Sequence, residues 1–123
     1  MDFNAVEQLK NVLSSMTIEK DQIIYEEGEP LGDGYILSIW KVQLLKNSRD
    51  GKLMQKQTVA SMQVFGVWNP MLGNNVRLFT AKALERLSAL VIPKATLDKK
   101  LSVLDPFLRF LFRQALTNNE NFE

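Results

Sequence analysis

The 123-residue sequence contains no cysteine and no histidine, and these two absences exclude most catalytic chemistry. Without cysteine the chain has no disulfide framework, no thiolate nucleophile and no cysteine-based zinc site. Without histidine it has no Ser-His-Asp or Cys-His arrangement and no histidine metal cage. Most hydrolases and metalloenzymes are therefore excluded, so we expect a protein that is not an enzyme and has no cofactor.

Long apolar runs and a strong net charge are also missing. No apolar run exceeds about five residues, which is far short of a membrane span. The first residues include an acid and no basic stretch, unlike a signal peptide. Fifteen basic residues against 14 acidic ones leave a net charge of +1, which provides no long-range attraction for nucleic acid. We expect a cytoplasmic protein that contacts neither membrane nor nucleic acid directly.

What the sequence does contain is typical of one globular domain, which we place at residues 1–123. The chain is 46% hydrophobic and 24% charged. Near the N-terminus, apolar residues recur at steps of three and four: Phe3, Val6, Leu9, Leu13 and Met16. This spacing predicts an amphipathic N-terminal helix over residues 1–18.

The segment 21–92 consists of short β-rich stretches separated by turns. Strand character occurs at 22–25, 35–45, 52–60, 76–83 and 87–92. A glycine-containing hairpin turn is expected at 47–51, and residues 64–75 are irregular. Many short strands at regular spacing predict a mainly β fold, an antiparallel barrel or jelly roll with helices at its ends.

Helical signals return in residues 93–117. Pro93 is expected to open a short helix over 94–101, as a first-turn proline does. Asp105 is a plausible N-cap, with Pro106 at the first position of a final helix that reaches about residue 116. The polar tail at 118–123 is expected to be frayed.

Several short motifs occur together in a recognisable order. They are Ile23-Ile24, Gly28-Glu29, Asp33, Tyr35-Ile36-Leu37, Lys41-Val42, Asp50-Gly51, Phe65-Gly66, Thr80-Ala81-Lys82-Ala83, Leu90-Val91-Ile92-Pro93 and Asp105-Pro106. In this order the chain resembles the cyclic-nucleotide-binding domains of catabolite-activator-type regulators, kinase regulatory subunits and gated channels. The resemblance implies an eight-stranded double-stranded β-helix with one N-terminal and two C-terminal helices.

The resemblance also implies where a ligand would bind. In the family, a Phe-Gly-Glu segment opens a short helix whose free N–H groups face the cyclic phosphate, and the Glu accepts the ribose 2′-hydroxyl. Here Phe65 and Gly66 are present, but Val67 stands at the Glu position. Valine accepts no hydrogen bond, so a buried sugar hydroxyl would remain unpaired at a cost of about 1–3 kcal/mol.

The family's phosphate-binding arginine has two candidate positions in this chain. Alignment on Thr80-Ala81 puts Asn75 at the arginine position and Val76 after it, whereas counting forward from Val67 reaches Arg77. On a strand, Asn75 and Arg77 would share one face, so Arg77 could reach a phosphate. The alternative is an arginine that is solvated or paired at the surface.

Other departures from the family pattern add bulk around this site. Trp40 stands where the family has a turn glycine with positive φ, so we expect the local turn to differ. Met62-Gln63 replaces a Gly-Asp pair, and Asn69-Pro70 would start the short helix late. Trp40, Trp68 or Met71 could fill the pocket; the tryptophans could instead stack on a purine, or pack on the core or a neighbouring subunit.

The final helix carries two apolar stripes where packing on one barrel needs only one. One stripe contains Phe107, Phe110 and Leu111, and the other contains Leu104, Leu108, Phe112 and Ala115. Two stripes predict a homodimer or partner contact through this helix. The alternative is a helix wedged between the barrel and the N-terminal helix.

Together these features predict a non-enzymatic regulatory or sensor module with a degenerate pocket that binds cAMP or cGMP weakly or not at all. Its ligand would be a cyclic nucleotide or another small anion. One alternative is a ligand-independent interaction or dimerisation domain. A second is the N-terminal sensor part of a transcription regulator that lacks its DNA-binding domain.

Overall fold

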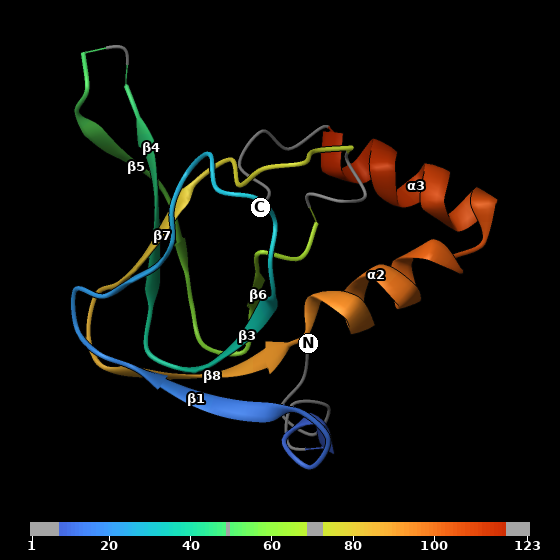
Figure 1. Ribbon diagram of the computed structural model, residues 1–123, viewed down its shortest axis with the longest axis horizontal. Helices are drawn as coiled ribbons and strands as arrows, with labels where there is room; N and C mark the ends of the chain where they lie inside the picture. The colour runs from blue at the N-terminus through green and yellow to red at the C-terminus, as the bar shows by residue number, and fades with distance from the viewer. Residues whose placement is uncertain (1–7, 49, 69–72, 118–123) are drawn as a thin grey trace.

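The strands form two four-stranded antiparallel sheets that face each other. The computed structural model describes residues 8–48, 50–68 and 73–117 (Figure 1). The strands are β1 (Ser14–Ile18), β2 (Ile23–Tyr25), β3 (Gly34–Ile39), β4 (Val42–Asn47), β5 (Leu53–Val59), β6 (Val64–Phe65), β7 (Thr80–Ala83) and β8 (Leu87–Ile92). One sheet has the order β1-β8-β3-β6 and the other β2-β7-β4-β5. The expected mainly β jelly-roll fold is confirmed.

The core lies between the two sheets, where alternate residues of each strand point inward. Leu37, Leu44 and Ala89 are fully buried, and Phe65 is 1% exposed. Complete burial of a side chain as large as leucine stabilises the fold by about 1.5–3 kcal/mol. A smaller cluster centres on Ile36 and Leu90 and includes Leu9 and Leu13 from the N-terminal segment.

The N-terminal helix predicted over 1–18 is wrong from Lys10 onward, because residues 10–13 form turns and β1 (Ser14–Ile18) follows them. Met16 pairs with Ala89 and Ile18 with Leu87, so β1 supplies an antiparallel neighbour to β8. A three-residue step at Leu13 and Met16 fits a helix, but the two-residue step from Met16 to Ile18 fits a strand. Residues 1–7 lie outside the described residues.

The expected strand at 76–83 is shorter than the sequence indicated. Only Thr80–Ala83 belongs to β7, and Val76 forms an isolated bridge with Pro30. The hairpin turn predicted at 47–51 is confirmed. Ser48 N donates to Lys52 O at 2.8 Å, and Gly51 has φ 81°. Positive φ at this position is the reason that glycine suits the turn.

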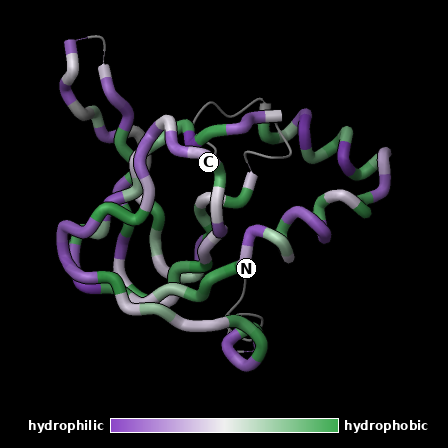
Figure 2. Tube along the Cα trace, in the orientation of Figure 1, coloured by the Kyte–Doolittle hydropathy of each residue, from purple (hydrophilic) through white to green (hydrophobic). Residues whose placement is uncertain are grey.

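Two helices follow the sheets and extend to one side of them (Figures 1 and 2). They are α2 (Lys94–Ser102) and α3 (Pro106–Thr117). Pro93 precedes the first residue of α2 as its N-cap and does not occupy the first helical position. Asp105 caps α3 as expected, since its Oδ1 accepts from Phe107 N at 2.9 Å and Leu108 N at 3.2 Å. The tail at 118–123 lies outside the described residues.

The apolar surface of α3 is largely open to solvent. Phe107, Leu108, Phe110, Leu111 and Phe112 are each more than 40% exposed. The alternative of a helix wedged between barrel and N-terminal helix is therefore wrong for the described residues. Within residues 8–48, 50–68 and 73–117, no helix is long and apolar enough to cross a membrane.

Candidate functional site

Arg77 is buried, and its guanidinium binds two backbone carbonyls. Only 3% of the residue is exposed. Nη1 donates to Gly66 O at 3.0 Å and Nη2 donates to Asp33 O at 2.6 Å. The alternative of a solvated or surface-paired arginine is therefore wrong.

The backbone around Arg77 explains this inward direction. Arg77 N donates to Glu29 O at 2.8 Å, and Gly28 N donates to Arg77 O at 2.9 Å. These bonds lie next to the Pro30–Val76 bridge, so the segment before β7 is pinned to the turn before β3. The segment is not part of a regular strand, so the directions of its side chains are set by this local pairing. Consequently Asn75 and Val76 are exposed, and the face that Asn75 was expected to share with Arg77 is not observed.

An aromatic group lies beneath the guanidinium. Arg77 Cζ lies 4.0 Å from the centroid of the Tyr25 ring. The rings of Tyr25, Tyr35 and Phe65 have centroids 5.1–6.4 Å apart; Tyr35 stacks on both of the others, while Tyr25 and Phe65 are tilted relative to each other. A cation over a ring face is stabilised by about 0.5–2 kcal/mol, which helps to hold Arg77 inside the fold.

The positive charge of Arg77 has no carboxylate partner among the described residues. Its acceptors are neutral carbonyls, and Nε has no hydrogen-bond partner there. Burial raises the pKa of the Tyr35 phenol, the Asp33 carboxylate raises it further, and Arg77 opposes both. The phenol therefore stays neutral and does not offset the cation. Arg77 is thus a buried side chain that is held by two carbonyls and a ring face, with its Nε–H left without an acceptor in the part of the chain that the structure describes.

Gly66 leaves the space that Arg77 uses. It has φ 73°, and a Cβ added there would lie 2.8 Å from Arg77 Nη1 and 3.2 Å from the Tyr25 ring. Any larger residue would push the guanidinium away from the Gly66 carbonyl. The Phe65-Gly66 motif is thus explained by the position of Arg77, while Phe65 itself is a core residue.

Val67 fills the position where the family pattern has a glutamate. It is 5% exposed. A Cβ added to Gly34 would lie 2.5 Å from Val67 Cγ1, which shows how tightly the valine packs on that backbone. Position 67 therefore carries a buried apolar side chain that lies against the Gly34 backbone.

Trp40 does not fill the pocket, and the prediction that its turn would differ is also wrong. The side chain is 57% exposed on the β3–β4 turn. Its φ is 74°, the positive value expected of the family's glycine, and Met62 likewise has φ 72°. Hydrogen bonds hold both turns: Ser61 Oγ donates to Trp40 O at 3.3 Å, and Met62 N donates to Leu37 O at 2.7 Å.

Trp68 packs against the last helix. Its ring centroid lies 6.4 Å from that of Phe112 on α3, with the rings stacked. This contact connects the segment after Gly66 with the helical end of the domain, by which we mean α2 and α3. Met71, the third candidate for pocket filling, lies outside the described residues.

The sequence reasoning missed two of the three residues that hold Arg77. Tyr25 was read only as part of a strand, and Asp33 only as part of the family resemblance. The glycines on either side of Asp33, Gly32 and Gly34, were an available signal for a close backbone approach. No group of three or more carboxylate, cysteine or histidine side chains that could hold a metal occurs within residues 8–48, 50–68 and 73–117.

The family can now be identified. A sequence profile of the cyclic nucleotide-binding domain family matches residues 15–102. The chain belongs to this family. Among solved structures of such domains, the cAMP-bound form of the EAL enzyme Bd1971 is 25% identical, with a TM-score of 0.75. The match covers 85% of this chain but only 28% of that enzyme, so the chain spans about a quarter of its length.

Two solved structures of transcriptional regulators share the fold over most of their own length and most of this chain. The N-terminal domain of a transcriptional regulator from Streptomyces coelicolor A3(2) is 23% identical, with a TM-score of 0.70, and covers 100% of this chain and 90% of that one. A transcriptional regulator from Thermotoga maritima is 19% identical, also with a TM-score of 0.70, over 96% and 88%. A search of curated protein sequences gives no match. These comparisons show the cyclic nucleotide-binding fold.

Proposed function

We propose that this chain is a non-enzymatic regulatory domain whose buried arginine already donates to two backbone carbonyls, so that it binds cAMP and cGMP weakly or not at all. The observation that carries the proposal is the pair of hydrogen bonds from Arg77 to Gly66 O and Asp33 O. The cAMP-bound structure of the related Bd1971 enzyme makes a cyclic nucleotide the first ligand to test.

Two costs oppose nucleotide binding. The N–H groups of Arg77 that bind Gly66 O and Asp33 O are not free for a phosphate, and releasing either one would forfeit a charge-assisted bond worth about 1.5–3 kcal/mol. The ribose hydroxyl would then face Val67, leaving it unpaired at a cost of about 1–3 kcal/mol. A small anion without a 2′-hydroxyl avoids the second cost and is the more compatible ligand.

Titration of the protein with each nucleotide tests this proposal. At 1 mM cAMP, a dissociation constant near 10 μM would stabilise the fold by about 2.7 kcal/mol and raise Tm by several degrees. We expect a shift close to zero by differential scanning fluorimetry, with inorganic phosphate as the comparison anion. A clear rise in Tm with cAMP or cGMP that is lost in Arg77→Ala would contradict the proposed weak or absent nucleotide binding.

A second candidate function is ligand-independent assembly through α3. It is favoured by the exposed apolar side chains at Phe107, Phe110 and Leu111. Light scattering over a range of concentrations tests it, and a concentration-independent monomer would exclude the homodimer. The likeness to the N-terminal domain of a transcriptional regulator also supports a sensor role within a longer regulator.

A further inference from the structure

Asp33 contacts both the arginine site and the first residue of α2, using different atoms for each. Its backbone oxygen accepts from Arg77 Nη2 at 2.6 Å. Its side-chain Oδ1 accepts from Lys94 N at 2.8 Å. Because one short residue receives both donors, a shift of the guanidinium changes the position from which the carboxylate reaches α2.

The carboxylate of Asp33 caps the N-terminus of α2 by accepting a hydrogen bond from a backbone N–H. Pro93 forms no side-chain capping bond, and α2 has no buried residue. The free N–H groups at a helix start need acceptors, and a carboxylate there also complements the helix dipole. Asp33 supplies this acceptor from a residue 61 positions earlier in the chain.

The neighbouring Gly34 is closely packed between the segment that holds Val67 and α2. A Cβ on Gly34 would lie 2.5 Å from Val67 Cγ1 and 3.5 Å from Leu97 Cδ2 on α2. The backbone at Gly34 is therefore enclosed by the ligand-site segment on one side and by α2 on the other. Closely packed elements of this kind transmit displacements instead of absorbing them.

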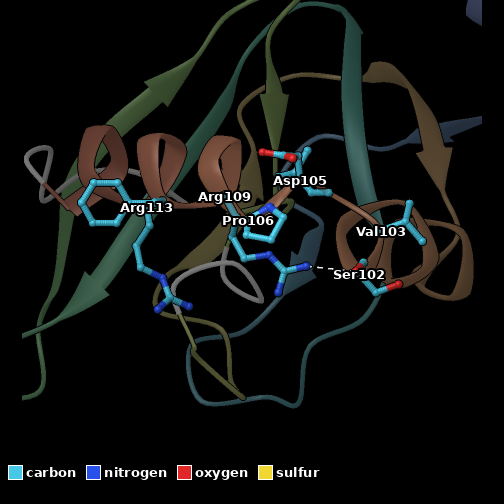
Figure 3. Close-up of a pocket in the computed structure, with 8 residues that line it drawn as sticks. Ser102, Val103, Asp105, Pro106, Arg109 and Arg113 are labelled. Atoms are coloured by element: carbon cyan, nitrogen blue, oxygen red, sulfur yellow. Dashed lines mark hydrogen bonds between the residues drawn. The ribbon is translucent and has the colours of Figure 1, made fainter.

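The far end of α2 is attached to α3. Arg109 Nη2 donates to Leu101 O at 2.9 Å and to Ser102 O at 3.0 Å, and the second bond is drawn in Figure 3. These are terminal carbonyls of α2, so an α3 side chain caps that helix. Arg109 also lines an open groove of about 580 Å³ between the helices.

We infer that Asp33 is a positioning residue that couples Arg77 to the helical end. When an anion draws the guanidinium away from Asp33 O, the capping bond to Lys94 N weakens and the start of α2 loosens. The inference rests on the proposed regulatory function, which gives the coupling its purpose. Reciprocity requires that any partner fixing α2 also favours the present position of Arg77.

Amide hydrogen exchange at residues 94–97 tests the coupling without a ligand, in the unaltered chain, Arg77→Lys, Asp33→Ala and the double variant. Lysine keeps the charge but cannot bind both carbonyls. We expect Arg77→Lys to accelerate exchange about fivefold or more when Asp33 is present, and less than about twofold in the Asp33→Ala background. Equal acceleration in both backgrounds, or none in either, would overturn the inference.

Asp105→Ala is the matched control, because the Asp105 carboxylate caps α3 as the Asp33 carboxylate caps α2. In the Asp105→Ala background, Arg77→Lys should still accelerate amide exchange at residues 94–97 about fivefold or more. If Arg77→Lys does not fold, the NMR resonance of Arg77 Nε–H decides instead. It should move in Asp33→Ala and not in Asp105→Ala; an unchanged resonance in Asp33→Ala would overturn the coupling. Because no ligand enters these experiments, their failure is distinguishable from a failure of the proposed weak or absent nucleotide binding.

Discussion

The β sandwich and the helical end are held together in different ways. Inside the sandwich, Leu37 and Leu44 are fully buried. By contrast α2 has no buried residue, and Leu116 is the buried residue of α3 among those described. The sheets are thus stabilised by apolar burial, whereas the helices depend on caps and a few side-chain contacts. A region held this lightly is the one expected to move when the other region changes.

Deletion of one leucine side chain in each region is the strongest test of this comparison. Leu44→Ala should lower the free energy of unfolding by about 2–5 kcal/mol, because it leaves a cavity between the sheets. Leu111→Ala on α3 should change it by less than about 0.5 kcal/mol, because that side chain is 45% exposed. Urea unfolding measures both. A comparable loss in Leu111→Ala would show that α3 is covered in solution.

Removal of the carbonyl-binding arginine in each region compares the contribution of such hydrogen bonds to stability in the sandwich and at the helical end. Arg77→Ala should cost about 2–3 kcal/mol, since two buried carbonyls lose their donor and the Tyr25 ring loses its cation. Arg109→Ala, which also serves two carbonyls but at the helical end, should cost about 1 kcal/mol. Chemical denaturation compares the pair, and a neutral Arg77→Ala would refute a structural role for the buried cation.

A pH dependence is expected at Glu27, in the turn between β2 and β3. Partial burial would raise the pKa of Glu27, but hydrogen bonds from Asn47 N and Lys46 Nζ, with the charge of Lys46, hold it below its ordinary value of 4.5. Its stabilisation is therefore complete above pH 4.5 and is lost as the pH falls through the lowered pKa.

Glu27→Gln should accordingly lower stability by about 1 kcal/mol at neutral pH and have little effect near pH 3. Unfolding curves at both pH values measure the difference. Asp98→Asn removes an exposed ion pair on α2 and serves as the control, which should be nearly neutral throughout. A pH-independent effect of Glu27→Gln would contradict this assignment.

The smallest expected effect concerns strain at the sandwich surface. A left-handed backbone costs a non-glycine residue about 1–2 kcal/mol, so Trp40→Gly should stabilise the fold by about 0.5 kcal/mol after the added freedom of the unfolded chain. The neighbouring Ile39→Gly, in β3, should destabilise it instead. Thermal unfolding distinguishes the two signs, and a loss of stability in Trp40→Gly would show that the exposed ring makes a stabilising contact.

The features that the sequence predicted are those set by neighbours in the chain. The hairpin around Gly51 and the cap at Asp105 depend on a few adjacent residues, and both are confirmed. The strand at Ser14–Ile18 was missed because it is stabilised by pairing with β8, whose partner residues lie about 70 positions later, from Ser14↔Val91 to Ile18↔Leu87. Sequence spacing within one segment carries no information about such a distant partner.

The same reason explains the errors at the candidate site. Arg77 is buried by carbonyls that lie 11 and 44 positions earlier, so its surroundings follow from the fold and not from its own segment. Trp40 occupies a conformation that its residue type disfavours, because the turn between β3 and β4 imposes it. The substitution of Val67 was visible in the sequence, but its close packing on Gly34 was not.

The stacking of Trp68 on Phe112 gives this domain an optical signal of its own. The chain has two tryptophans, and the other, Trp40, is mostly exposed on a turn of the sheets. In a Trp40→Phe variant, all indole emission would come from the single ring that touches α3. Displacement of that helix by a ligand or a partner would then change the emission directly, without any attached dye.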